Sequence, residues 1–484
     1  MPLSRIKSTS VTVKLFLICI LISIVYWTVI RPPLGGSILQ SKSEAPRDLD
    51  VPYVHRAQDP AKQRCPERRI ADKILVMLKT GATQSQASVP IQLLTALRCV
   101  PNLLVVSDLE QDIAGVHLHD VLTNVNETIR QTHIDFDLYR KLQLLKEQNL
   151  LDHLDSLAYS GKSAWPPGWH LDKYKFLHML EFAWKKQPNM DWYVLVETDT
   201  YLIWPSLLAW LDTLDPSQEA LIGSPNWIGT ELFPHGGSGI VFSGAAMRKF
   251  GETSLGMATL WDERMSVDCC GDHMLGLAAE AIGVPVLGAW PMLGEDGPRD
   301  IRYGPAAWCE PIVTMHHMSS GSIDAMQTFA DSRQTEAPIT FQDVFQHFLT
   351  ADSLPPSRND WSNEFTGDVY DIKDLRVDLA RVSFEACREA CSSFSECFQF
   401  QYKDAKECRL FKGFTLGKKK APDDNVHWRS GWNVPRIKDW VQDHAECPPP
   451  TWVNASVNSF RHDGNGATHE WYKAKYLSDK PGVS

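Results

Sequence analysis

The sequence lacks an excess of basic residues, and it lacks repeats. Its 48 lysines and arginines are outnumbered by 59 aspartates and glutamates, which gives a formal net charge of −11. Proteins that bind nucleic acid normally present a basic face, so this charge argues against a nucleic-acid partner and against a polyanionic substrate. We find no internal repeat, and the one low-complexity tract is Lys418–Lys420.

The chain has enough apolar residues to form more than one folded core. It contains 484 residues, of which 43% are hydrophobic and 10% aromatic. This length exceeds that of one ordinary domain, and the composition is that of a globular protein. We therefore expect two or more domains.

One uncharged apolar stretch lies near the N-terminus. Leu15–Ile30 contains no charged residue, and it is preceded by Arg5, Lys7 and Lys14. The excess of basic residues on the N-terminal side predicts a single-pass type II signal anchor at 11–31, with residues 1–10 in the cytosol and the rest in the lumen. Such a short span suits the thin membranes of the early secretory pathway.

A cleaved signal peptide is the alternative for this stretch, but it would need small residues at its end. Tyr26 and Trp27 stand there instead, which favours the anchor. In the lumen, most of the ten cysteines that follow Cys19 should be paired. The sequons at Asn126 and Asn454 are then candidate glycosylation sites.

After a polar linker at 32–64, interpreted as a stem, strand and helix patterns alternate. Alternation of this kind predicts a mainly parallel sheet in an α/β domain at 65–350. The expected strands are 73–81, 103–108, 193–196, 239–243 and 311–315, the last closing the sheet, and the expected helices are 90–100 and 174–185.

A smaller cysteine-rich unit is predicted at 356–450, followed by a tail at 451–484. Cys387 and Cys391 lie four residues apart on an expected helix, so their thiols share a face. Pairing of Cys387 with Cys408 and of Cys391 with Cys397 would link the helix to a hairpin, although four cysteines allow three pairings. A zinc site is the alternative, and the absence of paired CxxC spacing argues against it.

Acidic and imidazole side chains follow two of the expected strands. Glu197 and Asp199 come after 193–196, and His316 comes after 311–315. Ligands bind at the carboxyl ends of strands in open α/β sheets, and carboxylates with an imidazole can hold a divalent cation such as Mn²⁺. The alternative for the two acids is a solvated strand end, and the alternative for His316 is a hydrogen-bonded histidine at a sheet edge. The sequence does not decide whether His316 or His317 points inward.

Two further segments could approach a ligand. The sequence HGGSGIVFS (235–243) places Gly236, Gly237 and Gly239 before a strand, which allows close backbone approach or forms a tight turn. Asp272 begins an expected helix, where a carboxylate can serve as a general base or cap the helix.

Taken together and in this order, these features resemble the glycosyltransferase family 31 group, the Fringe-like and core 1 β1,3-galactosyltransferase-like enzymes, in its fungal-type branch. The resemblance covers about residues 65–330. The matching positions are Lys79 and Thr80 on the donor side, Glu197, Thr198, Asp199, Thr200 and Tyr201 for the D-D-D-T-Y metal motif, Gly236, Gly237, Ser238 and Gly239 for the acceptor loop, Asp272 and Gly276 for E-D-x-x-L-G, and His316 for the metal-binding histidine.

The resemblance implies a GT-A type single Rossmann-like domain that transfers a hexose from a UDP-sugar, with UDP-galactose or a UDP-N-acetylhexosamine as donor. The acceptor would be a hydroxyl of a glycan or glycoprotein, with inversion and a β1,3 linkage, in the Golgi. Asp272 would be the catalytic base, and Asp199 and His316 would hold Mn²⁺ or another divalent cation. Lys79, Thr80, Glu197 and Thr198 would also contact the donor. Independently of the resemblance, Trp227, Trp261 and Trp308 are candidates for stacking on sugar rings, with Trp227 assigned to the acceptor, although most of the seventeen tryptophans are expected in the core. Glu197 departs from the family, which usually carries aspartate there.

Residues 384–411 look like the centre of a PAN/Apple module, a fold that binds proteins or carbohydrate. The alternative to the enzyme is therefore a membrane-tethered carbohydrate-binding protein without activity, and Glu197 is its best argument. No carboxylate pair is placed for glycoside cleavage, so a secreted hydrolase ranks behind both. A disulfide from Cys269 or Cys270 to Cys309 is expected to fix the segment of Asp272. The sequence leaves open whether the protein forms a homodimer.

Overall fold

The structure is a computed structural model that describes residues 65–157, 167–229, 231–253, 256–335, 337–364, 372, 374–422 and 426–452. The predicted cytosolic segment, anchor and stem, residues 453–484 of the predicted tail and the sequon at Asn454 lie outside these residues. Within the described part of the chain, no helix is both long and apolar enough to cross a membrane.

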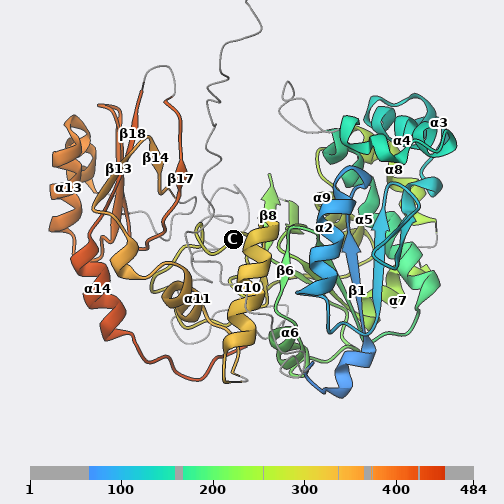
Figure 1. The fold of residues 1–484 in the computed structure, drawn as a ribbon, viewed down its shortest axis with the longest axis horizontal. Helices are drawn as coiled ribbons and strands as arrows, with labels where there is room; N and C mark the ends of the chain where they lie inside the picture. Colours follow the sequence, from blue (N-terminus) through green and yellow to red (C-terminus); the bar gives the residue numbers. More distant parts are fainter. Residues whose placement is uncertain are drawn as a thin grey trace, which may run out of the picture. The chain divides into compact units, whose positions relative to one another are not determined.

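The larger sheet is mixed and mainly parallel, as the alternating pattern predicts (Figure 1). Of its eight strands, β10 and β3 run against the others. The strand order is β11 (Val286–Gly288), β7 (Leu221–Gly223), β10 (Ile240–Ser243), β5 (Trp192–Glu197), β1 (Ile74–Lys79), β2 (Leu103–Ser107), β4 (Val116–Asp120) and β3 (Gln111–Ile113).

Both faces of the central strands are covered. Every residue of β1 is buried, which explains its continuous apolar run. One face packs on a cluster that includes Phe176, Tyr193, Phe242 and Leu275. The helices of this part are α2 (Ala82–Leu94), α3 (Glu127–Thr132), α4 (Asp137–Glu147), α5 (Pro167–Lys186), α6 (Trp204–Leu211), α7 (Gly244–Thr253), α8 (Met257–Val267), α9 (Gly271–Ala281), α10 (Ser320–Ser332) and α11 (Phe341–Phe348).

Two expectations for this domain are wrong. The helix expected at 90–100 is part of a longer helix that begins at Ala82 and ends at Leu94. Pro90 lies inside this helix and does not start it. The segment 311–315 does not close the sheet, since β12 (Thr314–Met315) pairs with β6 (Tyr201–Leu202) in a separate two-stranded sheet.

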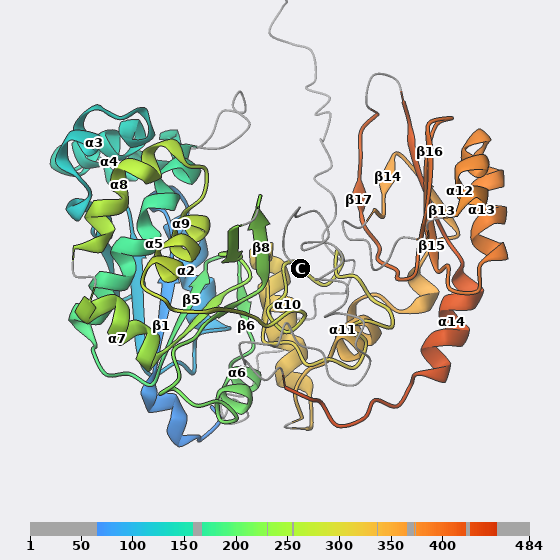
Figure 2. The same cartoon turned by 180° about the vertical axis from the view of Figure 1, so that it is seen from behind.

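The cysteine-rich region forms a second sheet with a helix along it (Figure 2). Helix α13 packs on this sheet through Phe384, Cys387 and Cys391, against Phe400 and Leu410. The sheet order is β13 (Ser357–Asn359), β18 (Trp428–Trp432), β15 (Gln399–Lys403) and β16 (Glu407–Phe411), and the remaining elements are β14 (Trp361–Ser362), β17 (Lys418–Lys419), α12 (Leu375–Leu379), α13 (Phe384–Ser393) and α14 (Val434–Asp443).

Five disulfides pair all ten cysteines of the described residues, as expected for an oxidising compartment. They are Cys65–Cys99, Cys269–Cys270, Cys309–Cys447, Cys387–Cys408 and Cys391–Cys397. The last two are the pairs expected from the sequence. The expected link from Cys309 to Cys269 or Cys270 is wrong, because Cys447 follows a helix whose Trp440 packs on Trp308, beside Cys309.

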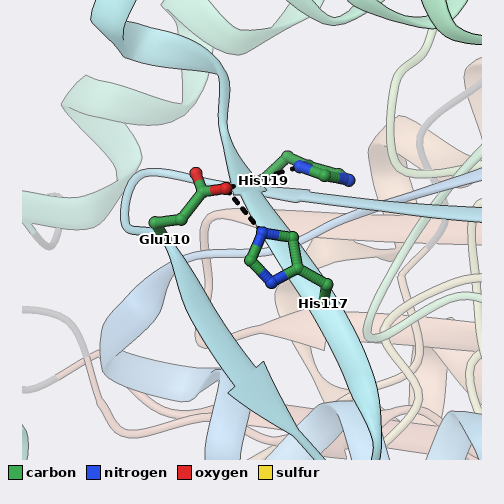
Figure 3. A group of neighbouring side chains, drawn as sticks. All are labelled: Glu110, His117 and His119. Carbon is green, nitrogen blue, oxygen red and sulfur yellow. Dashed lines mark hydrogen bonds and ion pairs between the residues drawn. The ribbon is translucent and has the colours of Figure 1, made fainter.

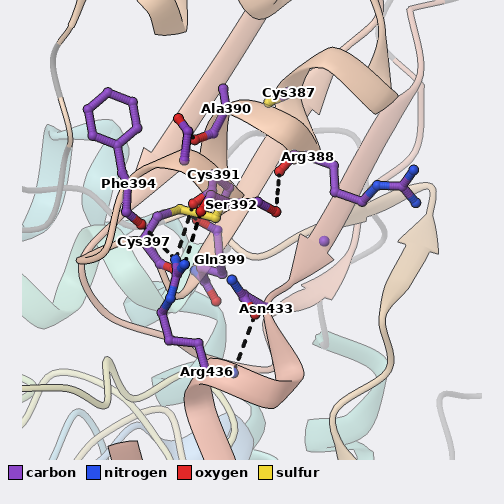
Figure 4. Close-up of a disulfide and its surroundings, with 12 residues drawn as sticks. Cys387, Arg388, Ala390, Cys391, Ser392, Phe394, Cys397, Gln399, Asn433 and Arg436 are labelled. Carbon is purple, nitrogen blue, oxygen red and sulfur yellow. Dashed lines mark hydrogen bonds between the residues drawn. A yellow bond between two sulfur atoms is a disulfide. The ribbon is translucent and has the colours of Figure 1, made fainter.

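An arginine fixes the end of α13 next to the Cys391–Cys397 disulfide (Figure 4). Arg436 Nη1 donates to the carbonyl oxygens of Cys391, Phe394 and Cys397 at 3.2, 2.7 and 2.6 Å, and Nη2 donates to that of Ser392 at 3.1 Å. The last carbonyls of a helix have no partner within it, and a cation favours that end of the helix dipole. One guanidinium therefore satisfies several such groups.

Replacing this side chain should destabilise the second sheet and its helix. We expect Arg436→Met to lower the free energy of unfolding by about 2 kcal/mol, because carbonyl groups lose charged donors. Urea denaturation followed by tryptophan fluorescence measures the change. Arg388→Met, on the exposed face of the same helix, should shift it by less than about 0.5 kcal/mol. Equal effects of the two variants would contradict the proposed role of Arg436.

Candidate functional site

The pairing of β6 with β12 brings two distant segments together. Tyr201 lies opposite Met315 in this antiparallel pair, so the residue groups before β6 and after β12 lie at the same end. The backbone N–H of Met318 donates to the carbonyl oxygen of Asp199 at 2.9 Å and holds this end closed. Asp199 and His316 therefore face one another, with 3.4 Å between Oδ1 and Nε2.

A second histidine completes a group of three metal-ligand side chains. His317 Nδ1 lies 4.0 Å from Asp199 Oδ2, and one donor atom from each of Asp199, His316 and His317 lies within 4.8 Å of the others. His317 has a φ of +55°, which turns its ring back beside that of His316, with 3.9 Å between the ring centroids. His316 is the buried one and His317 is exposed.

The electrostatics of this group favour a charged pair. Burial raises the pKa of Asp199, but His316 lowers it further, so the net shift is downward. Burial lowers the pKa of His316, while Asp199 raises it to a net upward shift. The other ring nitrogen of His316, Nδ1, is buried with no hydrogen-bond partner in the described residues.

The residues present fit a divalent cation. Asp199 offers hard carboxylate oxygens, and the imidazoles of His316 and His317 are acceptable ligands for manganese. The carboxylate is 46% exposed on its side chain, so it can reach an ion that keeps water or ligand oxygens in its other positions.

The glycine-rich loop lies directly against this group. A Cβ on Gly237 would overlap the imidazole of His316, so only glycine fits at that position. Two hydroxyls hold the loop in place, since Thr200 Oγ1 donates to Gly237 O at 2.7 Å and Thr314 Oγ1 donates to Ser238 O at 2.5 Å. The loop is thus held against His316.

Asp272 lies on the other side of the same loop. Its Oδ2 accepts a hydrogen bond from the backbone N–H of Gly236 at 2.9 Å. A Cβ on Gly236 would lie 3.4 Å from the Cβ of Asp272, so loop and carboxylate are in contact. Asp272 is in the first turn of α9 and half-buried. The consecutive residues Gly236 and Gly237 therefore connect Asp272 with His316.

Glu197 has a different role from Asp199. Lys79 and Glu197 are register partners on β1 and β5, and Lys79 Nζ lies 3.0 Å from Glu197 Oε1. The same ammonium pairs with Asp172 of α5. Burial alone lowers the pKa of Lys79, but the two carboxylates raise it well above its ordinary value. Glu197 thus balances a buried cation.

The turn between Glu197 and Tyr201 is fixed from α2. The side-chain amide of Gln92 donates to the carbonyl oxygens of Thr198 and Thr200 at 2.8 and 2.9 Å. Both threonines are buried. The predicted donor-side residue Thr198 therefore lies in a rigid turn that positions Asp199.

Sequence reasoning missed a second buried ion pair beside the first. Lys175 Nζ lies 3.0 Å from Asp108 Oδ2 and donates to the carbonyl oxygen of Thr80 at 2.6 Å. Asp108 follows β2 and accepts from the N–H of Ala82 at 2.7 Å, at the start of α2. Asp108 follows its strand as Glu197 and Asp199 follow theirs, and this shared pattern could have identified it.

A small pocket, open to solvent, adjoins β12. It shares Thr314 and Met315 with that strand and contains Glu295 and Asp296. Burial raises the pKa of Asp296 to about 6. The full lining is Trp290, Pro291, Gly294, Glu295, Asp296, Ile301, Arg302, Ala307, Ile312, Thr314, Met315 and Phe341.

The raised pKa of Asp296 predicts a pH dependence of stability. Its folded-state pKa, about 6, lies above the ordinary value of 3.8, so the folded state binds the proton more tightly and loses stability as pH rises between these values. We expect Asp296→Asn to be more stable than the wild type by about 3 kcal/mol at pH 7.5, with most of this difference lost near pH 4. Urea denaturation across this range measures it, and a constant difference would contradict the assignment.

Two other predicted residues, Trp227 and Asn126, do not belong to the group of Asp199, His316 and His317. Trp227 is on β8 (Pro225–Ile228), opposite Leu232 of β9 (Glu231–Pro234). This hairpin packs on α9, where a Cβ on Gly276 would collide with Phe233. Asn126 precedes α3, and its side chain accepts from the N–H of Thr128 at 2.9 Å.

Comparison with known proteins does not identify the chain. No protein-family model matches the sequence, and a search of curated proteins finds no significant match. The function is therefore argued from the residues and their geometry.

Proposed function

We propose that this chain is a metal-dependent, inverting glycosyltransferase of the GT-A type that takes a hexose from a UDP-sugar. The observation that carries the proposal is the convergence of Asp199 and His316, at 3.4 Å, beside a glycine loop that also touches Asp272. The metal-ligand pair and the candidate base lie on two sides of one backbone segment. This placement suits sugar transfer, which needs a metal at the leaving group and a base at the acceptor.

The metal ligands would act on the leaving group. Asp199 and His316, with His317 next to them, would hold Mn²⁺, which supplies a Lewis acid for the charge that grows on the departing UDP. Lys79 is occupied by Asp172 and Glu197, so it would position the ends of β1 and β5 and carry little of the donor's charge. Thr80 and Thr198 lie at those same strand ends.

Asp272 would act on the acceptor. Its Oδ2 is oriented by Gly236 N–H, so the carboxylate is held while the acceptor hydroxyl gives up its proton. The acceptor oxygen attacks the anomeric carbon from the side opposite UDP, and the proton passes to Asp272. The glycine loop and the β8–β9 hairpin with Trp227 would contact the acceptor.

The remaining parts suit a lumenal enzyme. Five disulfides agree with an oxidising compartment, and we propose a Golgi type II membrane protein. The second sheet with α13 is proposed as a PAN/Apple-like module that binds glycan or protein.

The experiment is a donor screen on the full chain. UDP-galactose, UDP-N-acetylglucosamine, UDP-N-acetylgalactosamine and UDP-glucose are incubated with Mn²⁺ or with a chelator, and UDP release is measured. We expect turnover of one donor that stops in the chelator. Glycan binding without release of UDP from any donor would instead establish the carbohydrate-binding alternative.

A further inference from the structure

A second group of metal-ligand side chains lies on the β3–β4 hairpin, at the edge of the larger sheet. The hairpin turns at Ala114 and Gly115, which have φ values of +51° and +80°. Asp112 lies opposite His117, and the register continued by one residue places Glu110 opposite His119. Alternate residues of a strand share one face, so all four side chains lie on the same face of the hairpin.

The donor atoms of three of these residues converge (Figure 3). Glu110 Oε1 lies 2.6 Å from His117 Nε2 and 3.5 Å from His119 Nδ1, and the three atoms lie within 4.8 Å of one another. A tetrahedral zinc with bonds of about 2.0 Å places its ligand atoms about 3.3 Å apart. The observed spacings bracket this value, so small side-chain rotations bring the three atoms to it.

Neighbouring groups orient these ligands from behind. Asp112 Oδ1 lies 2.8 Å from His117 Nδ1, which leaves Nε2 of that ring to face the cluster. Asp120 N–H donates to Glu110 Oε2 at 2.7 Å, so Oε1 stays toward the imidazoles. The ring of His119 packs on Phe182 with 4.8 Å between centroids. A carboxylate behind a ligand histidine is a common feature of zinc sites.

The arrangement is more than an ion pair. One imidazole would suffice for a hydrogen bond to Glu110, yet two imidazoles point at the same oxygen atom. The side chains of Glu110, His117 and His119 are 38%, 44% and 22% exposed, so a hydrated ion can reach them. Two nitrogens and one carboxylate oxygen are ligands that zinc takes readily, and they suit manganese less well.

We propose that Glu110, His117 and His119 bind one Zn²⁺, with water in the fourth position. The site is separate from the group at Asp199 and does not depend on the proposed enzymatic activity. Because β3 is an edge strand and its ligands lie on both sides of the hairpin turn, bound zinc would tie β3 to β4. Binding to the folded state alone also stabilises it.

The test is zinc binding by the full chain, measured by competition with a chromophoric chelator. We expect one bound equivalent to be lost in His117→Gln and in His119→Gln, with affinity at least about 100-fold weaker. Asp112→Asn should weaken binding about 10- to 100-fold, since it orients a ligand without contacting the ion. Bound Co²⁺ should give the visible absorption of a tetrahedral site in the wild type and lose it in both histidine variants.

Two controls make the result specific. His427, which pairs with Asp360 at 2.8 Å, offers a histidine and a carboxylate without a second imidazole nearby in the described residues, so His427→Gln should keep the zinc equivalent. Asp199→Asn should keep it too, which excludes the other metal group. The double variant His117→Gln/His119→Gln decides the matter. If it binds zinc with the stoichiometry and affinity of the wild type, and both proteins have the same Tm in chelator, the proposal is overturned.

Discussion

Asp272→Asn is expected to slow sugar transfer by about 10²- to 10⁴-fold, the usual contribution of a general base. The variant keeps an oxygen that can accept from Gly236 N–H, so the glycine loop and His316 should stay in place. The amide cannot take the acceptor's proton at neutral pH. We therefore expect kcat to fall while the Kd for Mn²⁺ and for the UDP-sugar changes little.

The matched control is Glu280→Gln, the same chemical change on the exposed end of α9. It should leave the rate within about twofold of the wild type. Single-turnover transfer and Mn²⁺ titration measure the two properties separately. An unaffected rate in Asp272→Asn would remove the residue from the mechanism, whereas weakened Mn²⁺ binding with a parallel loss of rate would make its role structural.

The strands that carry the site could be predicted because their cores are unambiguous. β1, β2 and β5 are short apolar runs rich in β-branched residues, and polar residues follow each one. The side chains that follow these strands are therefore expected to lie close together. Asp199 lies two residues after the end of β5, and the glycine loop lies directly before β10.

The sheet that makes this contact could not be predicted. β6 and β12 each contain two residues, too few for any periodic signal, so 311–315 was expected as a further strand of the large sheet. The pairing of Cys269 with Cys270 was missed for a related reason: disulfide partners depend on tertiary proximity, which spacing alone does not give.

The proposed zinc ligands have a signal in the sequence that is independent of the strand ends. His117 and His119 alternate with Leu118, which is typical of a strand with one buried face, and Ala114-Gly115 lies where a tight turn is needed. Two histidines two residues apart on such a strand share a face. What the pattern cannot supply is the convergence on Glu110, because it depends on the hairpin register.

Lys79→Met is expected to lower the free energy of unfolding by about 3–5 kcal/mol, the largest stability change we predict. Lys79 is 2% exposed, and its ammonium lies between Asp172 and Glu197 and 4.4 Å from the centroid of the Phe176 ring. Without it, two carboxylates remain near each other with one fewer cation. Burial raises the pKa of Asp172, but Lys79 holds the net value below its ordinary one.

The pH dependence tests this explanation. In the wild type, a lowered pKa of Asp172 gives stability that is present above its unfolded pKa and lost as pH falls, so the deficit of Lys79→Met should be largest near pH 7.5 and shrink toward pH 4. Urea denaturation at both pH values measures it. The control is Lys185→Met on α5, the helix that also carries Asp172. The ammonium of Lys185 is 4.0 Å from Glu181 and largely exposed, so this variant should change stability by less than about 0.5 kcal/mol. Adding Asp172→Asn and Glu197→Gln to Lys79→Met should recover most of the lost stability, because no uncompensated charge then remains. If the triple variant is as unstable as Lys79→Met alone, the loss comes from packing on Phe176 instead.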